Sequence, residues 1–285
     1  GKNGQLGKAL QKYASNKNIN FFNSKSDLDI SNFDNLEQVI SQFDADIIIN
    51  TAAYTNVEMA EKDNTNLYKS NVLGPYNLAL LCKKYKKKLI HISTDYVFDG
   101  FKNTPYFEDD QTNPLSEYGK SKLEGENKVI NLFDSYLIFR VSWLFSLSKN
   151  NFVSKIIKLS QKNNVLEVTN EEYSIPNCAD DLAKFLWFAC EKFVKSECRS
   201  GLYHYSQKGN IVSRFDFAKK ILDIMKNSGH KIPKIVPVSS SNLNYLAKRP
   251  KYSALSNKKL IQEFKYSLTN WENSLNNTLL KNFNL

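Results

Sequence analysis

The alternation of short apolar runs with amphipathic stretches over the first 145 residues limits the fold of this chain more than any other feature. Four apolar runs have the length of strands, at residues 19–23, 46–50, 88–93 and 136–142. Three stretches between them have the periodicity of helices, at residues 34–43, 65–85 and 116–133. Nearly continuous apolar strands joined by helices are typical of a parallel sheet covered on both faces. The pattern therefore predicts an α/β fold with a doubly wound parallel sheet.

Beyond residue 145 the alternation loosens. Helices are predicted at residues 151–161, 179–195 and 213–227, and strands at 165–168 and 201–206. The spacing Thr269-x-x-Glu272 is that of a capping box and predicts the start of a final helix. Because no flexible linker divides the chain, we expect two closely packed units, residues 1–145 and 146–285, with some elements of the second returning to the first.

The composition excludes several classes of protein. A chain of 285 residues with 41% hydrophobic residues, ten Gly and seven Pro is neither disordered nor fibrous. No stretch approaches about 18 consecutive apolar residues, and Arg140 interrupts the apolar run 137–145. We therefore expect no membrane-spanning segment.

The net charge of +10, from 39 basic and 29 acidic residues, is of a size that sometimes accompanies nucleic-acid binding. The lysines are scattered, however, and their one tight run, between Lys83 and Lys88, closes a predicted helix, where cations complement the helix dipole. No nucleic-acid recognition motif accompanies them, and we expect no nucleic-acid partner.

The four cysteines are Cys82, Cys178, Cys190 and Cys198. They include no Cys-x-x-Cys pair and form no ligand cluster with the three histidines. No signal peptide is evident either. These features predict reduced thiols, a cytoplasmic location and no bound metal.

Three glycines at the start of the chain have the spacing of a phosphate-binding turn. In Gly1-x-x-Gly4-x-x-Gly7, that spacing lets backbone N–H groups approach a pyrophosphate at the N-terminus of a helix. Such a turn normally follows a strand in the middle of the sheet, and no residue precedes Gly1. We therefore expect that about half a dozen residues, which would form this strand, are missing from the sequence.

The end of the predicted strand 19–23 bears on the choice of cofactor. An acid at this position usually binds the adenosine ribose and repels a 2′-phosphate. Here Asn23 takes that place, and Lys25 is available to a 2′-phosphate. Asp29 follows near the expected adenine end. The residues favour NADPH slightly and leave NADH possible.

Tyr118 and Lys122 lie four residues apart, on one face of a predicted helix. A nearby cation lowers the pKa of a phenol, so we expect Lys122 to lower the pKa of Tyr118. A tyrosine so placed can give a proton to a carbonyl oxygen as a hydride reaches the carbon, while the lysine also holds the nicotinamide ribose. By itself this spacing is common by chance and fits two surface residues as well, and its position after the strand 88–93 favours the catalytic interpretation. Thr94, at the carboxyl end of the strand 88–93, offers the same carbonyl a second hydroxyl.

These motifs together resemble the extended short-chain dehydrogenase/reductase pattern, which implies a Rossmann fold. They occur in its order: Gly1-x-x-Gly4-x-x-Gly7, Asn50-Thr-Ala-Ala-Tyr-Thr55, Asn71-Val-Leu-Gly74, Ser93-Thr-Asp-Tyr-Val-Phe98 and Tyr118-x-x-x-Lys122. More narrowly, the chain resembles the dTDP-4-dehydrorhamnose reductase family over its whole length. Three further segments carry that likeness: His91-Ile-Ser-Thr-Asp-Tyr-Val-Phe-Asp-Gly100, Phe139-Arg-Val-Ser-Trp143 and Arg249-Pro-Lys-Tyr-Ser253.

The resemblance implies a role for each matching residue. Tyr118, Lys122 and Thr94 would be catalytic, and residues 1–145 would form the dinucleotide-binding domain, with residues 146–285 mainly binding the sugar nucleotide. The implied cofactor contacts come from Gly1, Gly4, Gln5, Leu6, Gly7, Asn23, Asp29, Ile30, Ala53, Tyr54, Thr55, Ile92, Tyr118 and Lys122. The implied substrate contacts come from Thr94, Asp95, Trp143 and Arg249.

Several of these residues also have purely structural interpretations. Trp143 is equally suited to be an aromatic residue of the hydrophobic core. Arg249 is suited to a surface ion pair as well as to binding a diphosphate. His91, on a strand, is expected to be a satisfied core histidine, and Asn71 is as well suited to bonding the backbone as to catalysis.

The implied activity is reduction of the C4 keto group of dTDP-4-dehydro-L-rhamnose by NADPH or NADH, for surface polysaccharide synthesis, by a monomer or homodimer. Two departures leave alternatives open. The loop 171–177 lacks the aspartate-glutamine, glycine and threonine that the family usually shows, so a related reductase or epimerase acting on another sugar remains possible. The stretch Lys8-Ala9 lacks the acid that binds magnesium in some members. A noncatalytic dinucleotide-binding regulatory subunit is the third interpretation, and the intact set of Thr94, Tyr118 and Lys122 counts against it.

Overall fold

A four-stranded parallel sheet forms the centre of the molecule in this computed structural model, which describes residues 1–14, 28–148 and 151–283. Its strands lie in the order β1-β2-β3-β8. Their bounds are β1 Ile47–Asn50, β2 Lys88–Thr94, β3 Tyr136–Val141 and β8 Gly201–Tyr205. All four coincide with apolar runs that the sequence marks as strands. The predicted strand 19–23, and Asn23 with it, lies outside the described residues.

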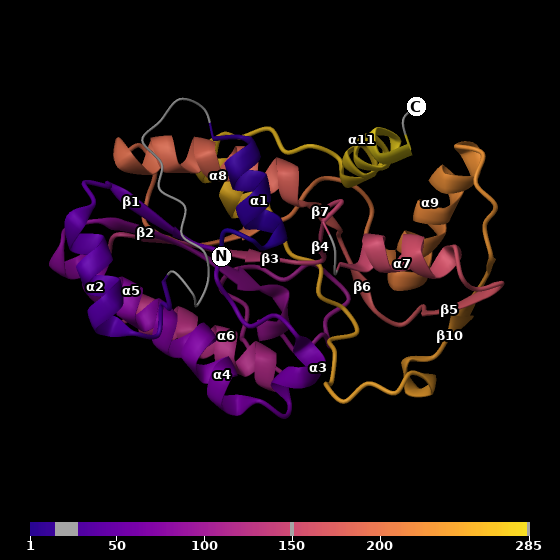
Figure 1. Cartoon of the computed structure of the whole chain (residues 1–285), viewed down its shortest axis with the longest axis horizontal. Helices are drawn as coiled ribbons and strands as arrows, with labels where there is room; N and C mark the ends of the chain where they lie inside the picture. The colour runs from indigo at the N-terminus through magenta and orange to yellow at the C-terminus, as the bar shows by residue number, and fades with distance from the viewer. Residues whose placement is uncertain (15–27, 149–150, 284–285) are drawn as a thin grey trace.

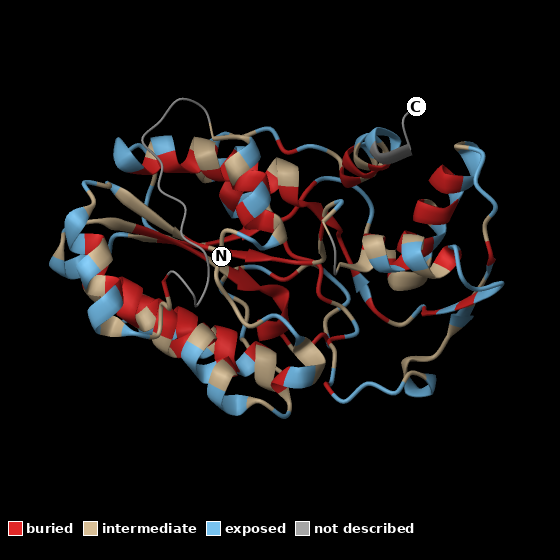
Figure 2. Ribbon diagram, in the orientation of Figure 1, coloured by how far each residue is buried: buried red, intermediate tan, exposed pale blue. Residues whose placement is uncertain are grey.

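Helices cover both faces of this sheet, as the doubly wound prediction requires (Figure 1). One face packs against α2 (Phe33–Gln42), α5 (Gly74–Lys84) and α6 (Glu117–Ile130). The other packs against α1 (Gln5–Lys12), α8 (Ala179–Val194) and α10 (Lys258–Phe264). Figure 2 shows β2 and β3 mostly buried between these two layers, whereas β1, at the edge of the sheet, is mostly of intermediate exposure. The fold class predicted from the sequence is confirmed.

The long helix predicted over 65–85 is divided into three consecutive parts. It runs as α4 (Asn64–Tyr68), a π-helical segment over Lys69–Leu73 and then α5. The short helix α3 (Val57–Ala60) precedes it, and a 3₁₀ turn over Asp95–Val97 follows β2.

A second core lies in the C-terminal half. It is built from α7 (Phe152–Ser160), α9 (Arg214–Asn227), α11 (Trp271–Phe283) and the pair β5 (Val165–Thr169) and β10 (Lys234–Val238). Two short pairs complete it: β4 (Leu144–Phe145) with β7 (Asn177–Cys178), and β6 (Tyr173–Ser174) with β9 (Val212–Ser213). Meanwhile α8, β8 and α10 return to the first core. The division of domains at residue 145 stays a prediction.

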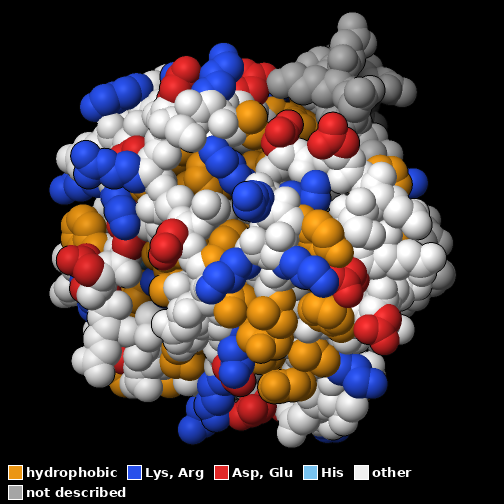
Figure 3. Space-filling model, turned by 90° about the vertical axis from the view of Figure 1, so that its left-hand side faces the viewer, with side chains coloured by type: hydrophobic (Ala, Val, Ile, Leu, Met, Phe, Trp, Pro, Cys, Tyr) orange, Lys and Arg blue, Asp and Glu red, His pale blue; other side chains and the backbone are white. Residues whose placement is uncertain are grey.

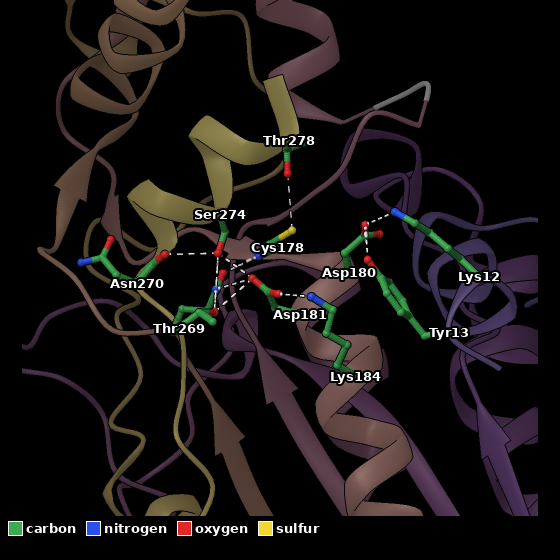
Figure 4. A network of polar contacts seen from close by, with 11 residues as sticks. Lys12, Tyr13, Cys178, Asp180, Asp181, Lys184, Thr269, Asn270, Ser274 and Thr278 are labelled. Atoms are coloured by element: carbon green, nitrogen blue, oxygen red, sulfur yellow. Dashed lines mark hydrogen bonds and ion pairs between the residues drawn. The ribbon is translucent and has the colours of Figure 1, made fainter. Parts of the chain in front are cut away.

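The polar network of Figure 4 corrects one expectation and shows how α1 is anchored. The cap of α11 is Asn270, whose Oδ1 accepts from the Glu272 N–H at 2.8 Å. Thr269 instead donates to Asp181 at the start of α8, because this partly buried carboxylate offers its hydroxyl a charged acceptor. The capping box predicted at Thr269 is therefore wrong. Next to it, Asp180 accepts hydrogen bonds from Lys12 and Tyr13 at the end of α1.

The lysine run ends a helix as predicted: Lys83 and Lys84 occupy the last turn of α5, and Lys83 donates to the Leu132 carbonyl. On the face in Figure 3, basic side chains are dispersed among acidic and apolar ones. All four cysteines are free thiols. Across the described ranges, no helix is long and apolar enough to span a membrane.

Candidate active site

The carboxyl end of β2 and the start of α6 bring together the three residues predicted to be catalytic. Thr94 ends β2 and is buried, and Ser116 caps α6, so that Tyr118 lies in its first turn. A Cβ at Gly119 would lie 2.2 Å from the Tyr96 carbonyl oxygen. Only glycine therefore lets α6 approach the turn after β2 this closely, and that approach lets Tyr118 and Thr94 form a hydrogen bond.

Tyr118 differs from its sequence-based expectation in one respect. Burial raises the pKa of its hydroxyl, and the hydrogen bond between Tyr118 and Thr94 offsets this only in part. The expectation that Lys122 lowers this pKa is wrong for the free protein, because burial dominates and the charges of Asp95 and Tyr96 raise the pKa further. The Tyr118 ring packs edge-on against Tyr96, with centroids 5.6 Å apart. Its hydroxyl is therefore protonated at neutral pH, as an ordinary phenol also is, and carries the proton that a donor must give.

Lys122 is almost fully buried, at 2% exposed, on the same face of α6. Its Nζ donates to the Ile92 carbonyl oxygen at 2.7 Å and lies 3.3 Å from His91 Nε2. Burial lowers the pKa of Lys122 to about 8, and the charge of Glu126 counteracts this in part.

Asp95 lies beside Thr94 and is 2% exposed. Its Oδ1 accepts from the Thr94 hydroxyl at 3.1 Å, while its Oδ2 has no hydrogen-bond partner within the described part of the chain. Burial raises the pKa of Asp95 to about 6, and the Ser253 and Thr94 hydroxyls and the charge of Arg214 offset this in part. An orphaned carboxylate oxygen here is suited to accept from a ligand hydroxyl.

The three glycines form the tight turn into α1 that their spacing predicts. A Cβ at Gly7 would lie 2.2 Å from the Gly1 carbonyl oxygen, and a Cβ at Gly1 would lie 2.1 Å from the Thr51 hydroxyl. No side chain caps the helix at Gly4, so the first backbone N–H groups of α1 are not taken up by a cap. Next to β1 and at a helix N-terminus, this loop suits a pyrophosphate.

Gln5 and Leu6 contribute differently to this loop. The Gln5 side chain donates to the Leu144 carbonyl oxygen at 3.2 Å and accepts from Ser146, which joins the loop to β4. The Leu6 side chain is buried in the core, so only its backbone is available to a ligand.

The remaining expected cofactor residues surround the ends of β1 and β2. The backbone of Tyr54 forms two hydrogen bonds with the Asn71 side-chain amide, which also donates to Ser121, so Asn71 bonds the backbone as anticipated.

The other expected cofactor residues differ in exposure. Ala53, which precedes Tyr54, is partly exposed, and Thr55, which follows it, is exposed. Ile92, on β2, is partly exposed. Asp29 accepts from Ser31, and the Ile30 side chain packs against Gly74.

Trp143 and Arg249 lie in the C-terminal half of the site, each in contact with a partner that the sequence did not single out. Arg214 stacks on the Trp143 ring, with Cζ 3.6 Å from the centroid. Arg249 forms an ion pair with Glu58 at 2.6 Å and lies over the Tyr245 ring, while its Nε is buried without a hydrogen-bond partner in the described structure. The ion pair anticipated for Arg249 exists, and it leaves one donor of the guanidinium unused.

Comparisons with known proteins place this geometry in a family. The family model "RmlD substrate binding domain" matches residues 1–283. A dTDP-4-dehydrorhamnose reductase of Aggregatibacter actinomycetemcomitans is 35% identical over 286 residues, covering 97% of this chain and 96% of that protein. The chain belongs to the dTDP-4-dehydrorhamnose reductase family.

Two solved structures of the family are similar throughout. The reductase of Bacillus anthracis, solved in complex with NADP, is 34% identical with a TM-score of 0.91, and the match covers 99% of this chain and 97% of that one. The reductase of Clostridium acetobutylicum is 35% identical with a TM-score of 0.89, covering 98% and 96%. The likeness to the family inferred from the motifs is confirmed.

Within the family fold, the divergent loop 171–177 holds two acids with different surroundings. Glu171 accepts hydrogen bonds from Ser239 and Ser240. Glu172 is 5% exposed, and its Oε2 lies 3.5 Å from Arg214 Nε. Its other carboxylate oxygen has no partner among the residues described. Sequence reasoning missed Arg214 and Glu172 as site residues, although the capping box at Ser213 fixes where Arg214 enters α9.

No group of three or more His, Cys, Asp or Glu residues in the described part of the chain is arranged to hold a metal ion.

Proposed function

We propose that this chain reduces the C4 keto group of dTDP-4-dehydro-L-rhamnose to give dTDP-L-rhamnose, with NADPH as the hydride donor. The observation that carries the proposal is the juxtaposition of Tyr118, Thr94 and Lys122 at the carboxyl end of β2. Family membership and the NADP-bound relative support it.

The residues present fit a nicotinamide dinucleotide. The uncapped N-terminus of α1 offers backbone N–H groups to the pyrophosphate, and the glycines leave room for its close approach. In our proposal Gly1, Gly4, Gln5, Leu6 and Gly7 hold the pyrophosphate. Asp29 and Ile30 lie at the adenine, and Ala53, Tyr54, Thr55 and Ile92 flank the rest of the cofactor. When bound, the nicotinamide supplies the hydride.

The protein supplies the proton. Tyr118, which is protonated at neutral pH, gives its hydroxyl proton to the substrate C4 oxygen. The Thr94 hydroxyl, which donates to Asp95 Oδ1 in the free protein, turns to donate a hydrogen bond to the same C4 oxygen. The amine of Lys122 holds the cofactor ribose. Removing water from this site strengthens each of these hydrogen bonds.

Substrate contacts complete the proposal. Asp95 Oδ2, which lacks a partner, accepts from a hydroxyl of the deoxyhexose, and Trp143 packs against the sugar. Arg249 binds the diphosphate, because a guanidinium pairs with phosphate oxygens through two parallel donors. We further propose that the protein acts in the cytoplasm, as a monomer or homodimer, on this small molecule and not on nucleic acid.

The test follows the loss of NADPH absorbance, and then of NADH absorbance, with freshly prepared dTDP-4-dehydro-L-rhamnose, using the wild-type chain and Tyr118→Phe. Rapid oxidation that depends on Tyr118 is expected. Cofactor binding without oxidation would refute the proposed activity and favour either another sugar-nucleotide substrate or a regulatory protein.

A second candidate is reduction or epimerisation of another nucleotide sugar, and the buried Glu172 favours it. The family usually has a glutamine where Glu172 stands, and its free carboxylate oxygen accepts but does not donate. Competition among dTDP- and UDP-sugars in the same assay separates the two candidates.

A further inference from the structure

A buried chain of three side chains runs from β1 across β2 to α6. Asn50 and His91 are paired in the β1–β2 register, and Lys122 reaches His91 from α6. Asn50 is 4% exposed, His91 0% and Lys122 2%. The proposed mechanism uses only Lys122.

The orientation of the Asn50 amide is set by the backbone beside it. Asn50 Oδ1 accepts from the Ala52 N–H at 3.0 Å, so its Nδ2 faces His91 Nδ1, 3.1 Å away. An amide nitrogen only donates, so His91 Nδ1 must accept. Burial, together with the charge of Lys122, lowers the pKa of His91 well below its ordinary value, which keeps the ring neutral. A neutral imidazole carries one hydrogen, and here it is on Nε2.

That hydrogen points to the Lys122 nitrogen, 3.3 Å away. An ammonium group has donors only, so it would meet the Nε2–H donor to donor. A neutral amine has a lone pair that accepts this hydrogen while it still donates to the Ile92 carbonyl oxygen at 2.7 Å.

The other groups around Lys122 do not supply a counter-ion. On its own helix, Glu126 is bound by Arg140 of β3 through Nε and Nη2, and Tyr118 is held protonated. Among the described residues, no carboxylate lies within ion-pair distance of Lys122. The charge of Glu126 favours the ammonium, but it acts without direct contact with Lys122 and does not outweigh burial, which favours the amine.

We propose that Asn50 and His91 are positioning residues for Lys122: Asn50 fixes His91 with its hydrogen on Nε2, and His91 donates that hydrogen to Lys122, which favours the neutral amine. Lys122 then changes charge close to the physiological range instead of far above it. The charge next to Tyr118 consequently depends on the geometry of β1 and β2. The importance of this charge for turnover rests on the proposed reduction, whereas the protonation itself is a property of the free protein.

A competing arrangement of these three side chains has the Asn50 amide in the opposite orientation. Turning the Asn50 amide around would place the hydrogen of His91 on Nδ1 and let Nε2 accept from a Lys122 ammonium. It would also remove the hydrogen bond from the Ala52 N–H to Asn50. The two arrangements differ in which nitrogen of His91 carries the hydrogen.

Nitrogen-15 NMR of the free protein at pH 9, labelled in histidine, distinguishes them, with His91 assigned by its contacts to the Asn50 side-chain amide. We expect the hydrogen of His91 on Nε2. His204 is the internal control: its Nδ1 lies 3.1 Å from the Tyr106 carbonyl oxygen, so its hydrogen is on Nδ1. A hydrogen on Nδ1 of His91 would overturn the proposal, whether or not the protein oxidises NADPH.

Asn50→Asp gives the second test. One carboxylate oxygen keeps the bond from Ala52, and the other accepts from His91 Nδ1, so Nε2 becomes an acceptor for a Lys122 ammonium. With nitrogen-15-labelled lysine, we expect one wild-type amine to titrate near pH 8 and its midpoint to rise by at least about one pH unit in Asn50→Asp. His204 should be unchanged. A wild-type midpoint above pH 10 would refute the inference, and this measurement stands even if the variant does not fold.

Discussion

Replacing Asp95 by Asn should make the stability of the protein relative to wild type rise with pH. Burial raises the pKa of this carboxyl from an ordinary value of 3.8 to about 6. Between these two values the native state binds a proton that the unfolded chain releases. The stability that depends on this proton is complete below pH 3.8 and is lost as the pH rises through 6.

The magnitude follows from the difference between the two pKa values. Ionised Asp95 costs the wild-type protein about 3 kcal/mol of unfolding free energy at pH 7 and less than about 1 kcal/mol at pH 4. Asparagine cannot ionise. The stability of Asp95→Asn relative to wild type should therefore rise by about 2 kcal/mol from pH 4 to pH 7, whatever constant difference its hydrogen bonds add.

Urea unfolding at pH 4, 5, 6 and 7, followed by tryptophan fluorescence, measures this rise. Asp99→Asn is the matched control, because Asp99 lies four residues from Asp95 and its pKa is shifted in the opposite direction. Although burial raises its pKa, hydrogen bonds from the Phe101 N–H and the Tyr106 hydroxyl hold the pKa of Asp99 below its ordinary value. That variant should lose stability relative to wild type as the pH rises. A difference for Asp95→Asn that is constant or falls from pH 4 to pH 7 would show that burial does not dominate at Asp95.

Three further substitutions test the proposed roles. Tyr118→Phe should lower kcat by roughly 10²- to 10⁴-fold and leave NADPH affinity nearly unchanged, as measured by turnover and fluorescence titration; unchanged turnover would exclude it as the proton donor. Gly7→Ala should weaken NADPH binding by more than about tenfold and lower Tm, because its Cβ would lie 2.2 Å from a backbone oxygen. In the control Gly4→Ala the Cβ would lie 3.3 Å from the nearest backbone oxygen, so Tm should be nearly unchanged. Equal Tm values for the two variants would contradict this reasoning. Arg249→Lys should raise KM for the sugar nucleotide by about tenfold with a smaller change in kcat, and steady-state kinetics showing the reverse would place Arg249 in the chemical step.

The sequence was sufficient for the sheet and for most of the helices. The strands β1, β2 and β3 are nearly continuous apolar runs, and α9 begins at the capping box of Ser213 and Asp216, where local residues decide the structure. The two-residue strands β4, β6, β7 and β9 were not predicted, because distant segments define them by pairing with each other. The capping box predicted for α11 was wrong for the same reason, because the Thr269 hydroxyl donates a hydrogen bond to a carboxylate distant in sequence, that of Asp181.

The candidate site shows the same limit. Motif spacing brought Tyr118, Lys122 and Thr94 together correctly. It gave the wrong direction for the pKa of Tyr118, because the direction depends on burial, which spacing does not report. The pairing of Asn50 with His91 follows from strand register, and the stacking of Arg214 on Trp143 joins residues 71 positions apart, so neither was accessible from local pattern.

Three titratable groups at the carboxyl end of β2 are all displaced toward their uncharged forms. The pKa of Asp95 rises, that of Tyr118 rises and that of Lys122 falls, and burial is the main cause in each case. For Tyr118 the shift costs no stability at pH 7, where a phenol is protonated in the folded and unfolded chain alike. Charged Asp95 and Lys122 do destabilise the native state, and in a site with little water each hydrogen bond that they form is stronger. A carboxylate with an unused oxygen and an amine with a low pKa therefore indicate that this site is completed by the hydroxyl groups of its ligands.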